Sequence, residues 1–151
     1  MKINIFNQSD LSAKSLPENA LVRRTITRAL GSLSKLKGTV NVIFVTEPEI
    51  RRLNKQYLRT GALTDVISFN YELPEGDSYE PGFGFGDIFI CADAALLQAK
   101  HLGHSVKKEL LFLAAHGALH LSGMDDATKE QLAAMDARAL GIITALAPKL
   151  K

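Results

Sequence analysis

The sequence has one cysteine and no long apolar run, and each shortage excludes a class of protein. Cys91 has no partner for a disulfide within the chain, which is typical of proteins in reducing compartments. The longest apolar run, Leu110 to Ala115, is far shorter than the roughly 20 residues that span a bilayer. The first residues also lack the uninterrupted apolar segment of a secretory signal. We therefore expect a cytoplasmic protein without a membrane partner.

The sequence also lacks a large excess of either positive or negative charge. Lys and Arg number 18 against 16 Asp and Glu, a formal net charge of +2. This surplus is too small to predict nucleic-acid binding by itself, so local basic clusters must decide that question. The 151 residues, 46% of them hydrophobic, are typical of one globular domain, and we expect a single domain over residues 1–151. A chain of this length folds without a metal, so a metal site here would serve function.

Periodicity and capping signals predict four strands and about five helices. Alternating and β-branched segments predict strands at residues 2–7, 39–46, 65–69 and 86–91. Apolar stripes and capping residues predict helices that begin near residues 16, 47, 93, 106 and 129. This order favours an α/β (α+β) fold, in which a small mixed sheet of about four strands packs with the helices.

The helix expected from residue 47 carries a basic stripe. Arg51, Lys55 and Arg59 recur at intervals of four residues, and Arg52 widens the stripe. Lys and Arg contacts supply most non-specific nucleic-acid affinity, so the stripe fits a phosphate backbone, although a solvated helix face explains it equally well. Three arginines also lie off the apolar stripe of the first helix: Arg23, Arg24 and Arg28. We interpret these three as a solvated face.

The stretch from His116 to Asp126 carries the strongest indication of chemistry. His116 and His120 stand four residues apart on a predicted helix, so both imidazoles can face one ion. Gly123 can end the helix and turn the chain back, which would deliver Asp126 as a third ligand. Two imidazoles at this spacing are the usual start of a zinc site. The motif therefore predicts one Zn²⁺ at the end of this helix.

Other roles stay open for these residues. Each histidine could be an ordinary core or surface histidine, and Asp126 could cap the helix that follows it. Asp125 competes with Asp126 both as ligand and as cap. Gly117 stands where the zinc-peptidase signature has the glutamate that serves as general base, which disfavours a peptidase. A zinc-bound water could still act if another carboxylate took its proton, and by residue type Asp65, Asp87 and Asp125 are the candidates.

Three blocks of the sequence together resemble a known family. Residues 116–126 are similar to the H-G-x-L-H-L-x-G-Y-D-H signature of the YbeY family of bacterial metal-dependent endoribonucleases. Residues 53–57 followed by 64–69 resemble the family's L-N-x-x-Y-R and P-T-D-V-L-S-F blocks, and residues 86–88 resemble its G-D-I block. The resemblance implies one α/β domain, a zinc ion at the histidine motif, and cleavage of single-stranded RNA in 16S rRNA maturation and ribosome quality control.

The chain departs from this family pattern at several positions. Asp126 stands where the family has its third histidine, and Met124 stands where it has tyrosine. Aspartate is an acceptable zinc ligand, so the expected site has two histidines and one aspartate. The family's arginine after Tyr57 is Leu58 here, and Arg59 is the candidate to replace it.

We therefore expect a zinc-dependent endoribonuclease whose metal ligands are His116, His120 and Asp126. Basic residues of the stripe are expected to hold the RNA: Arg51, Arg52, Lys55 and Arg59. The candidate catalytic residues are Arg59, Asp125 and Asp87. Expected partners are rRNA or other single-stranded RNA, and the small ribosomal subunit or ribosomal proteins. Two alternatives are a non-catalytic ribosome-maturation factor that binds rRNA or ribosomal protein, and a metallohydrolase of peptides or small molecules.

Overall fold

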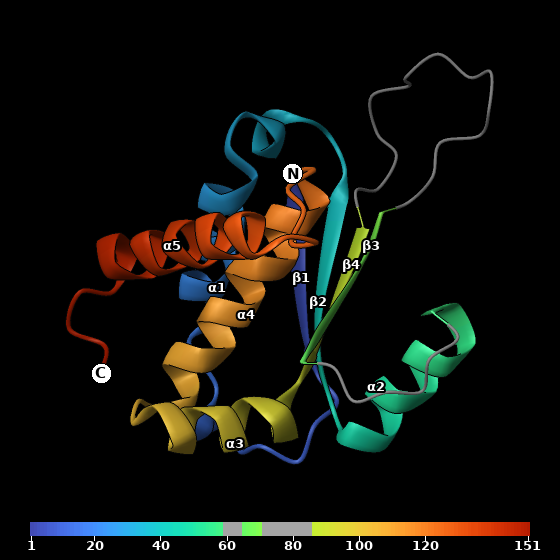
Figure 1. Ribbon diagram of the computed structural model, residues 1–151, viewed down its shortest axis with the longest axis vertical. Coiled ribbons are helices and arrows are strands. Elements are labelled where there is room, and N and C mark those ends of the chain that lie inside the picture. The colour runs from blue at the N-terminus through green and yellow to red at the C-terminus, as the bar shows by residue number, and fades with distance from the viewer. Residues whose placement is uncertain (59–64, 71–85) are drawn as a thin grey trace.

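A four-stranded mixed sheet forms the middle of the structure, a computed structural model that describes residues 1–58, 65–70 and 86–151. The strands β1 (Lys2–Asn7), β2 (Thr39–Val45) and β4 (Gly86–Cys91) run parallel. The edge strand β3 (Val66–Asn70) pairs antiparallel with β4, which gives the order β1-β2-β4-β3. The predicted α/β class with a small mixed sheet is confirmed (Figure 1).

Helices cover both faces of the sheet. On one face lie α1 (Asn19–Leu30), α4 (Val106–Leu121) and α5 (Lys129–Leu146), whereas α2 (Glu47–Leu53) lies on the other face (Figure 1). The remaining helix, α3 (Ala92–Leu102), packs against α4, and short helical turns complete the described chain: η1 (Ala13–Ser15), η2 (Gly31–Lys35) and the π-helical η3 (Asn54–Leu58). Within the three described ranges, no helix is both long enough and apolar enough to cross a membrane.

The alternation of side chains along the strands creates two apolar clusters. Val42 and Ile88 face the α4 side of the sheet, whereas Ile43 belongs to the cluster on the α2 side. Most residues of α4 are buried because this helix packs against the sheet, α1, α3 and α5. The central helix of the fold is therefore the one that carries the two histidines, and the core fixes their backbone positions.

Gly117 allows α4 to approach the sheet closely. A Cβ atom at this position would collide with the Cγ2 methyl of Ile88 and would lie 3.1 Å from Ser68 Oγ. Ser68 Oγ also donates a hydrogen bond of 3.0 Å to the Gly117 carbonyl oxygen. The position that carries the catalytic glutamate in a zinc peptidase therefore faces the sheet in this fold.

Local sequence signals set the helix ends with one exception. Ser105 caps α4 and Thr128 forms a capping box with Gln131 at the start of α5, as predicted. The first helix begins at Asn19 rather than near residue 16. Leu16 is extended, with φ −85° and ψ 147°, because the proline that follows it disfavours the helical conformation there.

Candidate functional site

The two histidines of the motif open onto one acidic pocket. His116 and His120 lie on consecutive turns of α4 and line a pocket that also contacts α3, α5 and the residues before β3. Four acidic side chains line the same pocket: Asp65, Glu109, Asp126 and Asp136. No Lys or Arg is among the described residues that line it. Its charge therefore favours a bound cation.

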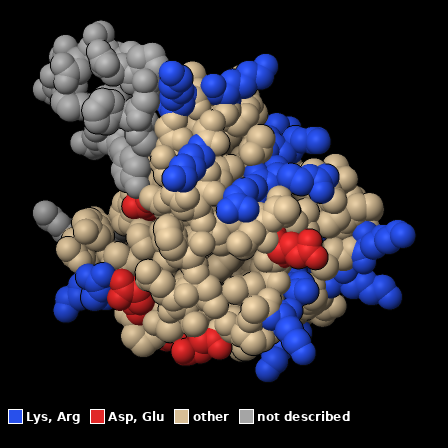
Figure 2. Space-filling view, turned by 180° about the vertical axis from the view of Figure 1, so that it is seen from behind, with Lys and Arg blue, Asp and Glu red and all other residues tan. Residues whose placement is uncertain are grey.

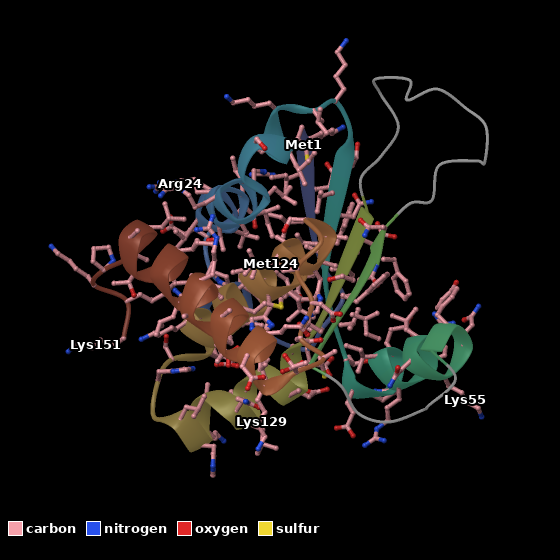
Figure 3. All side chains as sticks on the ribbon, turned by 45° about the horizontal axis from the view of Figure 1, so that its top comes forward. Met1, Arg24, Lys55, Met124, Lys129 and Lys151 are labelled. Atoms are coloured by element: carbon pink, nitrogen blue, oxygen red, sulfur yellow. The ribbon has the colours of Figure 1, made fainter. Side chains whose placement is uncertain are left out.

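The turn after α4 brings Asp126 to His120. Gly123 has a positive φ of 102°, and its amide donates a 3.0 Å hydrogen bond to the His120 carbonyl, so the chain reverses at the helix end. Met124 then packs against the main core cluster, and Figure 3 shows it in this turn ahead of Lys129 at the start of α5. As a result, Asp126 Oδ2 lies 3.3 Å from His120 Nε2.

This separation is that of an ion pair, and it also suits two ligands of a shared ion. Zinc takes nitrogen and oxygen ligands at about 2.1 Å, and two such ligands at a tetrahedral angle are about 3.3 Å apart. The predicted role of Gly123 in turning the chain is confirmed by the backbone geometry. The helix that follows is capped by Thr128, whose side chain accepts a hydrogen bond from the Gln131 amide, so Asp126 is not needed as a cap.

His116 has a different acidic partner, which the sequence motif does not include. Its Nε2 atom lies 2.7 Å from Asp136 Oδ1 on α5, a hydrogen-bonding distance. The His116 side chain is only 9% exposed and its ring lies against Phe112, with centroids 5.0 Å apart. The sequence motif gives no indication of Asp136, because this residue meets His116 only where α5 packs against α4.

The donor set fits a divalent ion in its chemistry, but its members stand in two pairs. Among the residues that the structure describes, no group of three His, Cys, Asp or Glu side chains encloses a single point. The ring centroids of His116 and His120 are 6.3 Å apart. Two imidazoles on one tetrahedral ion have centroids about 5.2 Å apart, so the rings must approach by about 1 Å to share an ion.

Two of the other predicted aspartates, Asp125 and Asp87, lie apart from the histidines. Asp125 is exposed, and its carboxylate accepts a 2.8 Å hydrogen bond from the Asp126 amide. Asp87 projects from the opposite face of the sheet to its neighbour Ile88, and Asn41 Nδ2 donates a 3.0 Å hydrogen bond to it. Of the three candidates for a proton acceptor, Asp65 is the one that lines the pocket.

Ion pairs within α2 reduce the charge of the predicted basic stripe. Arg51 Nη2 lies 2.9 Å from Glu47, and Arg52 Nη2 lies 2.6 Å from Glu49. The hydrogen bond from Arg52 lowers the pKa of the Glu49 carboxyl, so this pair stays ionised at neutral pH. Lys55 is exposed on the same segment, and Arg59 lies outside the described residues.

A second basic surface lies on α1. Three arginines line a hollow beside Leu146: Arg23, Arg24 and Arg28. Arg23 donates to a backbone carbonyl of β1, whereas no carboxylate in the described ranges pairs with Arg24 or Arg28. Lys and Arg side chains gather over the face seen in Figure 2, with few acidic side chains between them. Figure 3 places Arg24 and Lys55 on opposite sides of the molecule, so the two basic surfaces are separate.

Comparison with known proteins gives a consistent result over nearly the whole chain. The family model described as Endoribonuclease YbeY matches residues 4–147. Endoribonuclease YbeY of Elusimicrobium minutum is 44% identical over 136 residues, which are 90% of this chain and 93% of the relative. Endoribonuclease YbeY of Macrococcus caseolyticus is 42% identical over 144 residues, which are 93% of this chain and 92% of the relative.

A solved structure agrees with this result. The solution structure of TM1509 from Thermotoga maritima is similar with a TM-score of 0.54 and 26% identity, and the match covers 95% of this chain and 90% of that chain. The matched residues 4–147 include α4, the Gly123 turn and α5, and so the whole pocket around His116 and His120. The chain belongs to the YbeY family of endoribonucleases.

Proposed function

We propose that the protein is a metal-dependent endoribonuclease that cleaves single-stranded RNA in 16S rRNA maturation and ribosome quality control. The observation that carries the proposal is the acidic pocket in which His120 Nε2 and Asp126 Oδ2 stand 3.3 Å apart beside His116. Membership of the YbeY family supports RNA as the substrate and the phosphodiester bond as the bond that is hydrolysed.

In this proposal, His116, His120 and Asp126 hold one Zn²⁺, which when bound supplies a Lewis acid and lowers the pKa of a water molecule. The protein fixes the donors by two means, since the core fixes the backbone of α4 and the Gly123 turn fixes Asp126. Carboxylates line the pocket and repel a phosphodiester unless a cation is present. Binding of RNA at the histidines is therefore expected to require the metal.

Two further roles complete the proposed reaction. Asp65 lines the pocket and is our candidate for the group that accepts the proton of the attacking water. Arg59 stays a prediction as the residue that orients the phosphate, because it lies outside the described residues. Asp125 and Asp87 have no assigned step, since one is exposed and the other lies on the far face of the sheet.

Metal analysis of the purified protein tests the ligand set. We expect one zinc per chain in the parent, and loss of the zinc together with RNA cleavage in His120→Ala and Asp126→Ala. Asp125→Asn is the matched control, because it removes a neighbouring carboxylate that does not face the pocket. A parent that holds no divalent metal when purified without chelators, and that cleaves no RNA after metal is added, contradicts the proposal.

Two surfaces are candidates for holding the RNA backbone, one on α2 and one on α1. The prediction for Arg51, Arg52, Lys55 and Arg59 stands, but ion pairs to Glu47 and Glu49 weaken the first two as phosphate ligands. The α1 arginines offer charge that no described carboxylate neutralises. We therefore propose that the α1 cluster also contacts phosphates; it lies beside Leu146, which is ten residues, or about 15 Å at 1.5 Å each, along α5 from Asp136.

Salt dependence of RNA binding distinguishes the two surfaces. Replacing Arg24 and Arg28 by Gln should reduce the slope of log K against log salt by about 1.4, since each phosphate contact on single strands contributes about 0.7. The control replaces both α2 ion pairs by Gln at all four positions, which keeps the net charge of the protein. An unchanged slope in the α1 variant, with a reduced slope in the α2 variant, would assign the RNA to α2 alone.

One observation favours a second function. The donors stand in two pairs rather than around one point, which suits a ribosome-maturation factor that binds rRNA or ribosomal protein without cutting. Metal-loaded protein that binds RNA, leaves it intact and still restores 16S maturation in a depleted strain would support this function. The peptide-hydrolase alternative has no comparable support, because position 117 faces the sheet.

A further inference from the structure

We propose that Asp136 is a fourth protein ligand of the metal centre, so that two imidazoles and two carboxylates hold the ion. The inference rests on the proposed metal site and extends it to α5, beyond the signature that ends at Asp126. It starts from the contact of 2.7 Å between Asp136 Oδ1 and His116 Nε2. Asp136, His116, His120 and Asp126 all line the same pocket.

The ring nitrogen that makes each contact indicates the role of Asp136. A carboxylate that only orients a metal-bound histidine bonds to the nitrogen that does not face the ion. Here both carboxylates contact the same ring atom, Nε2, in His116 and in His120. If Asp126 and His120 share the ion as proposed, Nε2 is the ring atom that faces it, and Asp136 contacts this same atom in His116.

The His116–Asp136 pair needs only a small change of its own to become a ligand pair, in addition to the approach of about 1 Å between the two rings. An increase from 2.7 Å to about 3.3 Å, the separation of two ligands on one tetrahedral ion, moves the carboxylate by about 0.6 Å. The Asp136 side chain is 48% exposed, so it can make this shift without repacking the core.

Two carboxylates change which metal the site favours. They place a charge of −2 on the ligand set, and oxygen ligands suit harder ions such as Mn²⁺ better than a histidine-rich set does. Four protein ligands fill a tetrahedral zinc site, so zinc binds water there only by expanding to five ligands, whereas an ion that takes five or six ligands keeps positions open for a phosphate oxygen and water. The second carboxylate should therefore raise the affinity for Mn²⁺ more than that for Zn²⁺.

Competition with a chromophoric chelator measures the affinities of the apo-protein for Zn²⁺ and Mn²⁺. We expect Asp136→Asn to weaken Zn²⁺ binding by more than about a hundredfold, beyond the 10- to 100-fold cost of losing an orienting group, and Mn²⁺ binding by a larger factor. Asp136→Glu, which keeps the carboxylate, should recover most of the loss. Asp125→Asn is the matched control and should bind both ions as the parent does. Visible absorption of the Co²⁺-loaded proteins reports whether the ligand set changes.

The outcomes separate this inference from the proposed function. Parental affinity in Asp136→Asn, with metal lost in Asp126→Asn, overturns the fourth ligand and keeps the three-residue site. A loss below about a hundredfold with an unchanged Co²⁺ spectrum assigns Asp136 an orienting role and also overturns the inference. A parent that binds neither ion defeats the proposed metal site itself.

Discussion

Replacing Gly117 by Ala tests whether the close approach of α4 to the sheet organises the site. The new methyl would meet Ile88 Cγ2, on a β-branched side chain that is completely buried and has few rotamers to change. Overpacking of this kind costs up to about 3 kcal/mol. Alanine gains about 1 kcal/mol over glycine in a helix interior. The net expectation is a loss of about 2 kcal/mol in the free energy of unfolding.

Gly141→Ala is the matched control on another helix. Gly141 lies exposed in α5, and a Cβ there would have nothing within 4 Å, so alanine should stabilise the protein by about 1 kcal/mol. Urea unfolding of both variants should show opposite shifts in midpoint at an unchanged m-value, a difference of about 3 kcal/mol. If Gly117→Ala proves as stable as Gly141→Ala, the packing argument for α4 is refuted.

Two further predictions concern the thiol and the start of α5. Burial raises the pKa of the Cys91 thiol, so it is protonated at neutral pH, and a disulfide reagent should label it only after unfolding; labelling of the native protein at the rate of a free cysteine would contradict this. Thr128→Ala removes the cap of α5 and should cost about 1 kcal/mol in urea unfolding. Thr144→Ala, an exposed site on the same helix, should cost little, and an equal loss there would argue against the capping box.

Features that depend on neighbouring residues could be predicted from the sequence. The strands follow from alternation, and the starts of α4 and α5 follow from Ser105 and Thr128, whose side chains bond to backbone amides three residues later. The approach of Asp126 to His120 also depends on one short turn, through Gly123. The ion pairs Glu47–Arg51 and Glu49–Arg52 could also be predicted from local spacing, since residues three or four apart are neighbours on a helix.

Features that depend on helix packing could not be predicted. Asp136 is twenty residues from His116, and the two meet only because α5 lies against α4. Nothing in the local sequence fixes how these helices are placed against each other. The separation of the histidine donors into two pairs depends on the same packing, as does the placement of the α1 arginines beside Leu146.

The most direct test of the central claim is cleavage of a single-stranded RNA by the chelated protein before and after divalent metal is restored. We expect no cleavage without metal, recovery on addition of Zn²⁺ or Mn²⁺ to the parent and to Asp125→Asn, and no recovery in His120→Ala. Cleavage that survives chelation, or that His120→Ala retains at the parental rate, would contradict a metal-dependent reaction at this pocket.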